Sequence, residues 1–220
     1  MKPIIEKKSL IPDHQFGFRN NHATVEQVHR MVNLINAGLE EKKYCSAAFL
    51  DVSQAFDKVW HQGLRYKLKK LLPAHFYNIL ESYLHNRFFY VDFKGEETTL
   101  RSVLSGVPQG SVLGPLLYFI YTADLPTSNH TSLYTFAHDT AIIAVHEDPA
   151  VASSHLQNHL NKVGDWLKEW KIKANATKSQ HITFTLRRND CPAVTLDEVE
   201  VPRSDSVKYL GRRYLTLTEG

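Results

Sequence analysis

The order of apolar and polar residues predicts several amphipathic helices. Apolar residues recur every three or four positions within 22–41, 60–72, 73–86 and 149–173. This is the spacing of a helix that buries one face. A shorter and mostly apolar run at 116–123 predicts one further helix.

Between these helices lie runs that favour strands. Residues 44–52 are mostly apolar without interruption, which is typical of a strand covered on both faces. Residues 88–93 and 98–104 predict two strands joined by a turn. The run 180–186 alternates like a strand, and a last strand ends within 207–211.

The stretch 134–145 predicts a β-hairpin with the polar pair His138-Asp139 at its tip. A hairpin tip holds ionisable groups rigidly, as catalysis requires; the alternative is an ordinary polar turn. Asp51 ends the apolar run 44–52, where a carboxylate is costly unless it has a partner or a metal. These aspartates are the first candidates for chemistry.

Two loops and one helix face carry weaker signals. Residues 105–115 contain three glycines and two prolines, and a Gly-rich loop before a helix lets backbone approach a nucleotide. This loop matches neither the Walker nor the dinucleotide fingerprint. Arg19, in a loop at 12–21, is either a phosphate ligand or a solvated residue. The basic residues of 60–72 are interpreted as a solvated face: Arg65, Lys67, Lys69 and Lys70.

Composition narrows the setting. The 220 residues are 43% hydrophobic and 22% charged, an ordinary globular composition. The formal net charge of +3 permits nucleic-acid binding without requiring it. Two cysteines are too few for a disulfide framework or a cysteine zinc site. With no signal-peptide pattern and no apolar run long enough to span a bilayer, we expect an intracellular protein, nuclear or cytoplasmic, that does not enter membranes.

Five segments form a set of motifs. In chain order they are QFGFR at 15–19, FLDVSQAFDKVW at 49–60, GVPQGSVLGP at 106–115, FAHDTA at 136–141 and YLG at 209–211. Together they resemble the reverse transcriptase domain of non-LTR (LINE-type) retrotransposons, close to the insect jockey-like group. The resemblance covers nearly the whole chain.

The resemblance implies an α+β fold, the right-hand polymerase shape, with an antiparallel palm sheet, packed helices and fingers. It implies partial fingers at 1–43, a palm at 44–211 with fingers segments inserted at about 60–104, and a divergent tail at 212–220. We expect one reverse transcriptase domain over 1–220 that is truncated at both ends, with the thumb absent.

The implied activity is that of an RNA-directed DNA polymerase, a nucleotidyltransferase that extends a primer 3′-OH with two Mg²⁺ ions. Magnesium prefers hard oxygen ligands. The resemblance assigns these to Asp51, Asp139 and the backbone carbonyl of Val52. It places Lys178 where a lysine neutralises or protonates pyrophosphate, and the position of His138 is that of a further aspartate.

The resemblance also assigns contacts with substrates. Arg19 corresponds to a fingers residue that binds the triphosphate, and Phe56 to the bulky residue that excludes a 2′-OH. Gln109 and Gly110 belong to the loop that packs on the nascent base pair. The primer grip is assigned to Tyr209, Leu210 and Gly211. The implied partners are an RNA template, a DNA primer and deoxynucleoside triphosphates; the oligomeric state stays open.

His138 is the main departure from this pattern. Histidine is neutral near pH 7 and its nitrogen suits zinc, copper or nickel better than magnesium. Loss of one carboxylate ligand predicts a rate loss on the order of a thousandfold, with weak metal binding, including Mn²⁺, still possible. The alternatives are a non-catalytic nucleic-acid-binding remnant and a product without selected function that folds poorly. Binding by the remnant would use Arg19, Arg65, Lys67, Lys69, Lys70 and Lys178.

Overall fold

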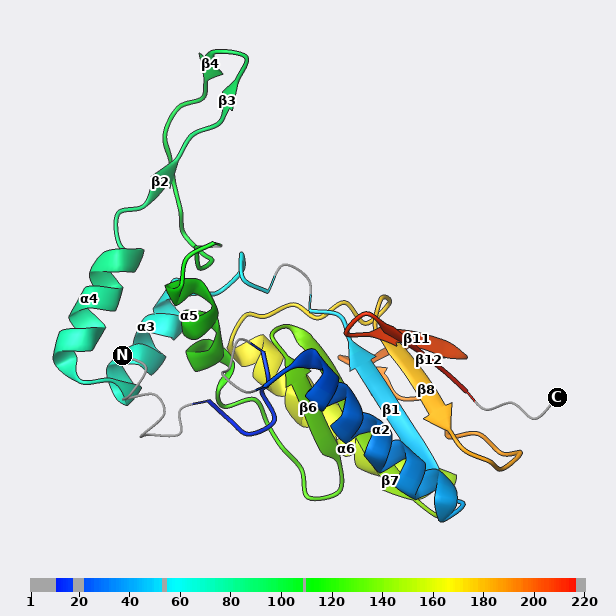
Figure 1. Cartoon of the computed structure of the whole chain (residues 1–220). Coiled ribbons are helices and arrows are strands. Elements are labelled where there is room, and N and C mark those ends of the chain that lie inside the picture. The colour runs from blue at the N-terminus through cyan, green and yellow to red at the C-terminus, as the bar shows by residue number, and fades with distance from the viewer. Residues whose placement is uncertain (1–10, 18–21, 53–54, 109, 217–220) are drawn as a thin grey trace. The chain divides into compact units, whose positions relative to one another are not determined.

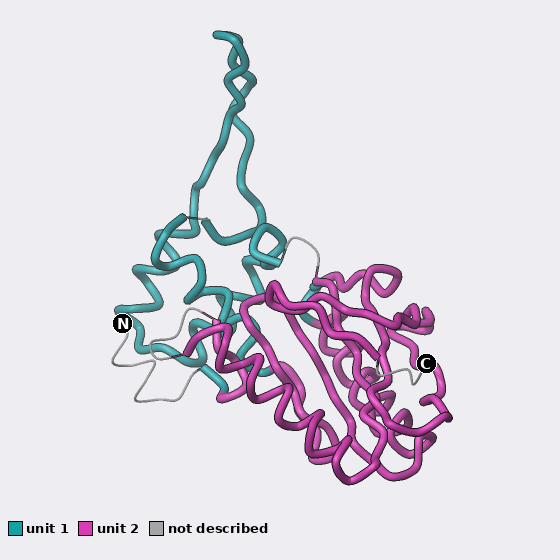
Figure 2. Tube along the Cα trace, turned by 45° about the vertical axis from the view of Figure 1, so that its right-hand side comes forward, with its two compact units in different colours: residues 1–12, 54–124, 170–172 teal, residues 13–53, 125–169, 173–220 magenta. Residues whose placement is uncertain are grey.

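A computed structural model (Figure 1) describes residues 11–17, 22–52, 55–108 and 110–216. The chain divides into two compact units, which Figure 2 shows in different colours. Unit 1 comprises residues 1–12, 54–124 and 170–172, and unit 2 comprises residues 13–53, 125–169 and 173–220. Each unit draws on segments that are distant in sequence.

Unit 2 is built on a four-stranded antiparallel sheet with the order β6-β7-β1-β8. These strands are β6 (Ser132–Phe136), β7 (Asp139–His146), β1 (Tyr44–Leu50) and β8 (Gln180–Phe184). All residues of β1 are buried, as its uninterrupted apolar run predicts. Its inner position in the sheet gives it hydrogen-bonded neighbours on both sides.

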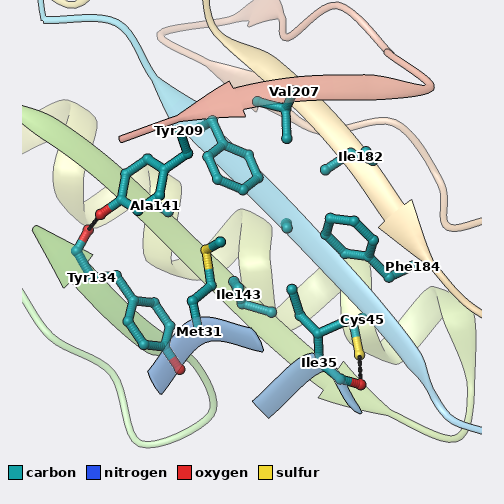
Figure 3. Packing of buried hydrophobic residues seen from close by; sticks show 12 residues of the cluster. Met31, Ile35, Cys45, Tyr134, Ala141, Ile143, Ile182, Phe184, Val207 and Tyr209 are labelled. Carbon is teal, nitrogen blue, oxygen red and sulfur yellow. Dashed lines mark hydrogen bonds between the residues drawn. The ribbon is translucent and has the colours of Figure 1, made fainter. Parts of the chain in front are cut away.

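Two helices cover this sheet, α2 (Thr24–Glu40) and α6 (Pro149–Glu169). Met31 and Ile35 of α2 pack with alternate β1 residues, including Cys45 and Phe49, in one hydrophobic cluster (Figure 3). Helix α6 packs against β1 and β7 from the other side of the sheet (Figure 1). Its last residue is Glu169, so the helix is shorter than the predicted 149–173.

Two small hairpins complete unit 2. One pairs β9 (Thr195–Leu196) with β10 (Val199–Glu200), and the other pairs β11 (Ser206–Tyr209) with β12 (Arg212–Leu215). The second turn, Leu210-Gly211, has positive φ at both residues, 48° and 77°, as a type I′ turn requires. The structure thus joins 212–215 to the last predicted strand, although the sequence pattern set 212–220 apart as a tail.

Unit 1 contains α3 (His61–Leu71), α4 (Ala74–Leu84) and α5 (Leu113–Thr122). Helix α5 begins three residues before the predicted start at 116. Gly114 and Pro115 therefore lie in its first turn, where proline is tolerated because the first N–H groups have no partner within the helix. The loop before α5 is correspondingly shorter than the predicted 105–115.

A thin hairpin arm, residues 88–102, extends from the helices of unit 1 (Figure 1). It contains two short antiparallel ladders, where the sequence predicted two longer strands. Its strands are β2 (Phe88–Phe89), β3 (Asp92–Phe93), β4 (Glu96–Glu97) and β5 (Arg101–Ser102). Large apolar side chains of the arm are exposed, among them Phe88 and Phe93.

The two units group the predicted segments as follows. Helix α2, inside the predicted fingers segment 1–43, packs on the sheet of unit 2. The segment 60–104 lies in unit 1 together with α5. Among the described residues, no helix is both long and apolar enough to cross a membrane.

Candidate active site

The sheet register brings Asp51 and Asp139 together. Leu50 of β1 pairs with Thr140 of β7 in antiparallel register, so Asp51 and Asp139 are the next residues at the same end of neighbouring strands. Both are partly buried. Burial raises the pKa of Asp139, and the nearby Asp51 carboxylate raises it further, while His138 lowers it. Two carboxylates that interact in this way favour a shared cation or proton.

The hairpin turn differs by one residue from the predicted tip. Phe136 pairs with Asp139, so the turn is Ala137-His138 and Asp139 is the first residue of β7. Ala137 has a φ of 57°, because two-residue hairpin loops of the primed types need positive φ at their first position. The His138 side chain is exposed on this turn, whereas Asp139 is held by the strand.

A buried glutamine fastens this turn to an earlier segment. Gln15 is 4% exposed, and its side-chain amide bonds the backbone of Ala137. The sequence motif at 15–19 contains Gln15, but the resemblance assigned a role there to Arg19 alone. Arg19 lies outside the described residues. The signal that sequence reasoning missed is a glutamine beside Phe16 and Gly17, two buried residues of the same motif.

The end of β1 is attached to the turn before β8. The Asp51 N–H donates to Ser179 Oγ at 3.1 Å, and the Asp51 carbonyl accepts from the Asn175 N–H at 2.8 Å. Val52 forms an antiparallel bridge with Ala174. Lys178 belongs to this turn and its side chain is exposed. The structure therefore places the turn that carries Lys178 beside the backbone of Asp51.

Tyr209 is a core residue near the same carboxylates. Its hydroxyl donates to the Tyr134 carbonyl at 3.3 Å (Figure 3), and its ring meets Phe49 edge-on at 5.5 Å between centroids. Burial raises the pKa of Tyr209, and the Asp139 carboxylate raises it further. The Tyr209 ring is buried, whereas Gly211 in the turn that follows is exposed.

In unit 1, the loop before α5 is fastened to the segment that carries Phe56. The Val107 N–H donates to the Phe56 carbonyl at 2.8 Å, and a Cβ on Gly106 would lie 2.7 Å from the Asp57 carbonyl oxygen. The partly buried Phe56 ring packs on Tyr118 of α5 at 4.5 Å between centroids. Gly110 is exposed, with a φ of 79°, and Gln109 lies outside the described residues.

Lys67 does not belong to a solvated basic face, so that interpretation is wrong. Lys67 is 5% exposed, and its Nζ donates to the Tyr121 carbonyl and to the Asp124 carboxylate. Nζ also lies 3.4 Å from the centroid of a Trp170 ring. Helical spacing places Lys67 beside the buried Leu64 and Leu68. The exposed lysines of α3 are Lys69 and Lys70, and Arg65 is partly buried.

The donor atoms at the strand ends fit a hard divalent cation. Asp51 and Asp139 supply carboxylate oxygens, the ligand type that Mg²⁺ and Mn²⁺ favour. The Asp51–Asn175 bond uses the carbonyl of Asp51 rather than that of Val52. Among the described residues, no group of three or more histidine, cysteine or acidic side chains is arranged to hold a metal ion. Among the described residues, the candidate metal site therefore has two carboxylate side chains.

Known proteins are similar to this chain over nearly its whole length. The model of the family "Reverse transcriptase (RNA-dependent DNA polymerase)" matches residues 1–214. The chain is 43% identical over 214 residues to a probable RNA-directed DNA polymerase from transposon X-element of Drosophila melanogaster, covering 94% of this chain and 24% of that protein. It is 40% identical over 209 residues to the RNA-directed DNA polymerase from mobile element jockey of the same species, covering 91% and 23%. The chain thus spans about a quarter of these relatives.

Solved structures share the fold at low identity. The apo telomerase from Candida tropicalis, truncated from its C-terminal domain, has a TM-score of 0.64 and 13% identity over 98% of this chain and 44% of that chain. A telomerase from the same species, solved with a fragment of telomeric RNA, has a TM-score of 0.61 and 13% identity over 91% and 36%.

Proposed function

Because this chain belongs to the reverse transcriptase (RNA-dependent DNA polymerase) family, we propose that it forms fingers and palm of a non-LTR retrotransposon polymerase whose activity His138 lowers. The substrates are an RNA template, a DNA primer and deoxynucleoside triphosphates. The proposal rests on one observation, the interacting carboxylates of Asp51 and Asp139 at adjoining strand ends.

Asp51 and Asp139, with the backbone carbonyl of Val52, hold divalent cations in this proposal. Bound metal ions of this type activate the primer hydroxyl and steady the triphosphate and its leaving pyrophosphate. The chain supplies fixed oxygens for them, because Asp51 directly follows β1 and Asp139 begins β7 in the same ladder. Lys178 adds a positive charge from the turn attached to Asp51, where it neutralises or protonates the pyrophosphate.

The resemblance assigns nucleotide contacts to residues of unit 1, and the proposal keeps them. In this proposal Phe56, whose ring packs on Tyr118, is the bulky residue that excludes a ribose 2′-OH. Gly110 lets backbone approach the nascent base pair, and Gln109 and Arg19 complete the contacts with the pair and the triphosphate. The primer grip comes from the Leu210-Gly211 turn, with Tyr209 anchoring it in the core.

His138 removes one negative charge from this centre. It stands next to Asp139 on the hairpin turn. An imidazole offers nitrogen where magnesium prefers carboxylate oxygen. We expect catalysis to fall on the order of a thousandfold relative to a carboxylate at this position.

Primer extension on an RNA template tests the proposal, with the parent chain and His138→Asp compared in Mg²⁺ and in Mn²⁺. We expect weak or no extension by the parent and restored extension by the variant. His29→Asp is the matched control, because it makes the same exchange on the exposed side of α2 and should change nothing. Equal extension by parent and His138→Asp would show that position 138 needs no carboxylate.

A second candidate function is nucleic-acid binding without catalysis. The exposed side chains of Lys69, Lys70 and Lys178 favour it, since lysines bind phosphates and release counterions. Salt-dependent binding to template–primer by folded chains, with no extension even by His138→Asp, would support this candidate over the polymerase.

A further inference from the structure

The Gln15 side chain makes a complete hydrogen-bonded clamp on the hairpin turn. Its Oε1 accepts from the Ala137 N–H at 2.9 Å and from the Gly17 N–H at 2.8 Å. Its Nε2 donates to the Ala137 carbonyl at 3.3 Å. One amide therefore satisfies both backbone groups of Ala137, the residue two positions before Asp139.

The segment around Gln15 is itself fastened to β6. Gln15 forms a parallel bridge with Thr135, and the Phe16 N–H donates to the Thr135 carbonyl at 3.0 Å. A Cβ on Gly17 would lie 2.5 Å from the Ala137 nitrogen, so a side chain at residue 17 has no room. The turn is thus held by the Gln15 amide and by close backbone contact with Gly17.

Ala137 has a backbone conformation that needs such support. Its φ of 57° lies in the left-handed region, which residues with a Cβ rarely adopt. Because Gln15 bonds both the N–H and the C=O of Ala137, this residue has little freedom to change its backbone conformation. Since Asp139 follows the turn directly, the clamp fixes where β7 begins.

We infer that Gln15 is a positioning residue that, through Ala137, sets the affinity of the Asp51 and Asp139 carboxylates for a divalent cation. The inference rests on the proposed function, which assigns the cation to these carboxylates. Glutamine suits the role because its amide donates and accepts from one end. Glutamate would lack the donor and bring a buried charge close to Asp139, and methionine would fill similar space without either bond.

Mn²⁺ binding to the folded, metal-free chain tests the inference, with free Mn²⁺ followed by electron paramagnetic resonance. We expect Gln15→Met to weaken binding by about tenfold or more, the effect typical of groups that orient metal ligands. The matched control is Gln157→Met. The Gln157 amide holds Thr195 in the same manner, with its Nε2 donating to the Thr195 carbonyl at 3.0 Å and its Oε1 accepting the Thr195 N–H at 2.7 Å.

The control should lose folding stability as Gln15→Met does but bind Mn²⁺ within twofold of the parent. Asp139→Asn distinguishes failure of the proposed metal site from failure of the positioning role, because it removes a proposed metal ligand. If Asp139→Asn leaves Mn²⁺ binding unchanged, the proposed site fails. If Asp139→Asn weakens binding while Gln15→Met acts no more than Gln157→Met, the positioning role alone is overturned. Should Gln15→Met fail to fold by circular dichroism, Gly17→Ala carries the same test, because its Cβ displaces Ala137, and unchanged binding again overturns the role.

Discussion

Replacing Lys67 with methionine should destabilise the protein more than any exchange of an exposed lysine on the same helix. The Lys67 ammonium group donates to the Tyr121 carbonyl and to Asp124 and lies over the Trp170 ring. All of these residues belong to unit 1. Methionine keeps most of the apolar stem but provides no donor, so the Tyr121 carbonyl loses its charged partner.

The expected loss follows from three contributions. A hydrogen bond from a charged donor contributes about 1.5–3 kcal/mol, and a desolvated cation–π contact contributes about 2 kcal/mol. The ion pair adds little, at most about 1 kcal/mol, because the Asp124 side chain is 52% exposed. Methionine regains part of this total, since it avoids burying an ammonium group. A net loss of about 2–4 kcal/mol in the free energy of unfolding results.

Urea unfolding measures this loss, with tryptophan fluorescence as the signal, since Trp60 and Trp170 lie in unit 1. Lys70→Met is the matched control, because Lys70 is exposed on the same helix. It should stay within about 0.5 kcal/mol of the parent. The reasoning is refuted if Lys67→Met and Lys70→Met unfold at the same urea concentration.

Two further outcomes are expected. The pKa of Asp139 is raised in the folded state, so the metal-free protein should lose stability as pH rises from the ordinary aspartate pKa through the raised value. Unfolding measured in EDTA should show this loss for the parent but not for Asp139→Asn. Parallel pH profiles of the two proteins would contradict the prediction. Gly106→Ala should lower stability in thermal unfolding by more than Gly110→Ala. Both glycines have positive φ, which costs alanine about 1–2 kcal/mol, but of the two only Gly106 has a carbonyl oxygen, that of Asp57, in the way of a Cβ. Equal losses would contradict the role of close packing at Gly106.

Periodicity predicted most elements of this fold because their packing follows their own sequence pattern. Helices α2, α3 and α4 and strand β1 lie within a few residues of the predicted ranges. The deviations come from local chemistry that periodicity does not contain. Helix α5 accepts Gly114 and Pro115 in its first turn, and the hairpin loop uses Ala137 in a left-handed conformation.

The site depends on long-range contacts that the local sequence pattern does not contain. A carboxylate at the end of an apolar run marks Asp51, and a polar pair at a predicted hairpin tip marks Asp139. Neither pattern contains the register that makes them neighbours. The local pattern gives no sign of the buried positions of Gln15 and Lys67, because their partners lie 122 and 54 residues away in sequence. Polar side chains are expected at the surface unless a buried partner is known.

The arm lies in the sequence between the central strand of the sheet and its neighbours. Strand β1 precedes the arm, whereas β6, β7 and β8 follow it, and β1 lies between β7 and β8 in the sheet. A backbone cut at the exposed arm therefore yields two fragments, and the central strand belongs to one while its neighbours belong to the other. Neither fragment can complete the sheet alone, so the cut protein becomes a heterodimer of its own halves, and its recovery from denaturant becomes dependent on concentration.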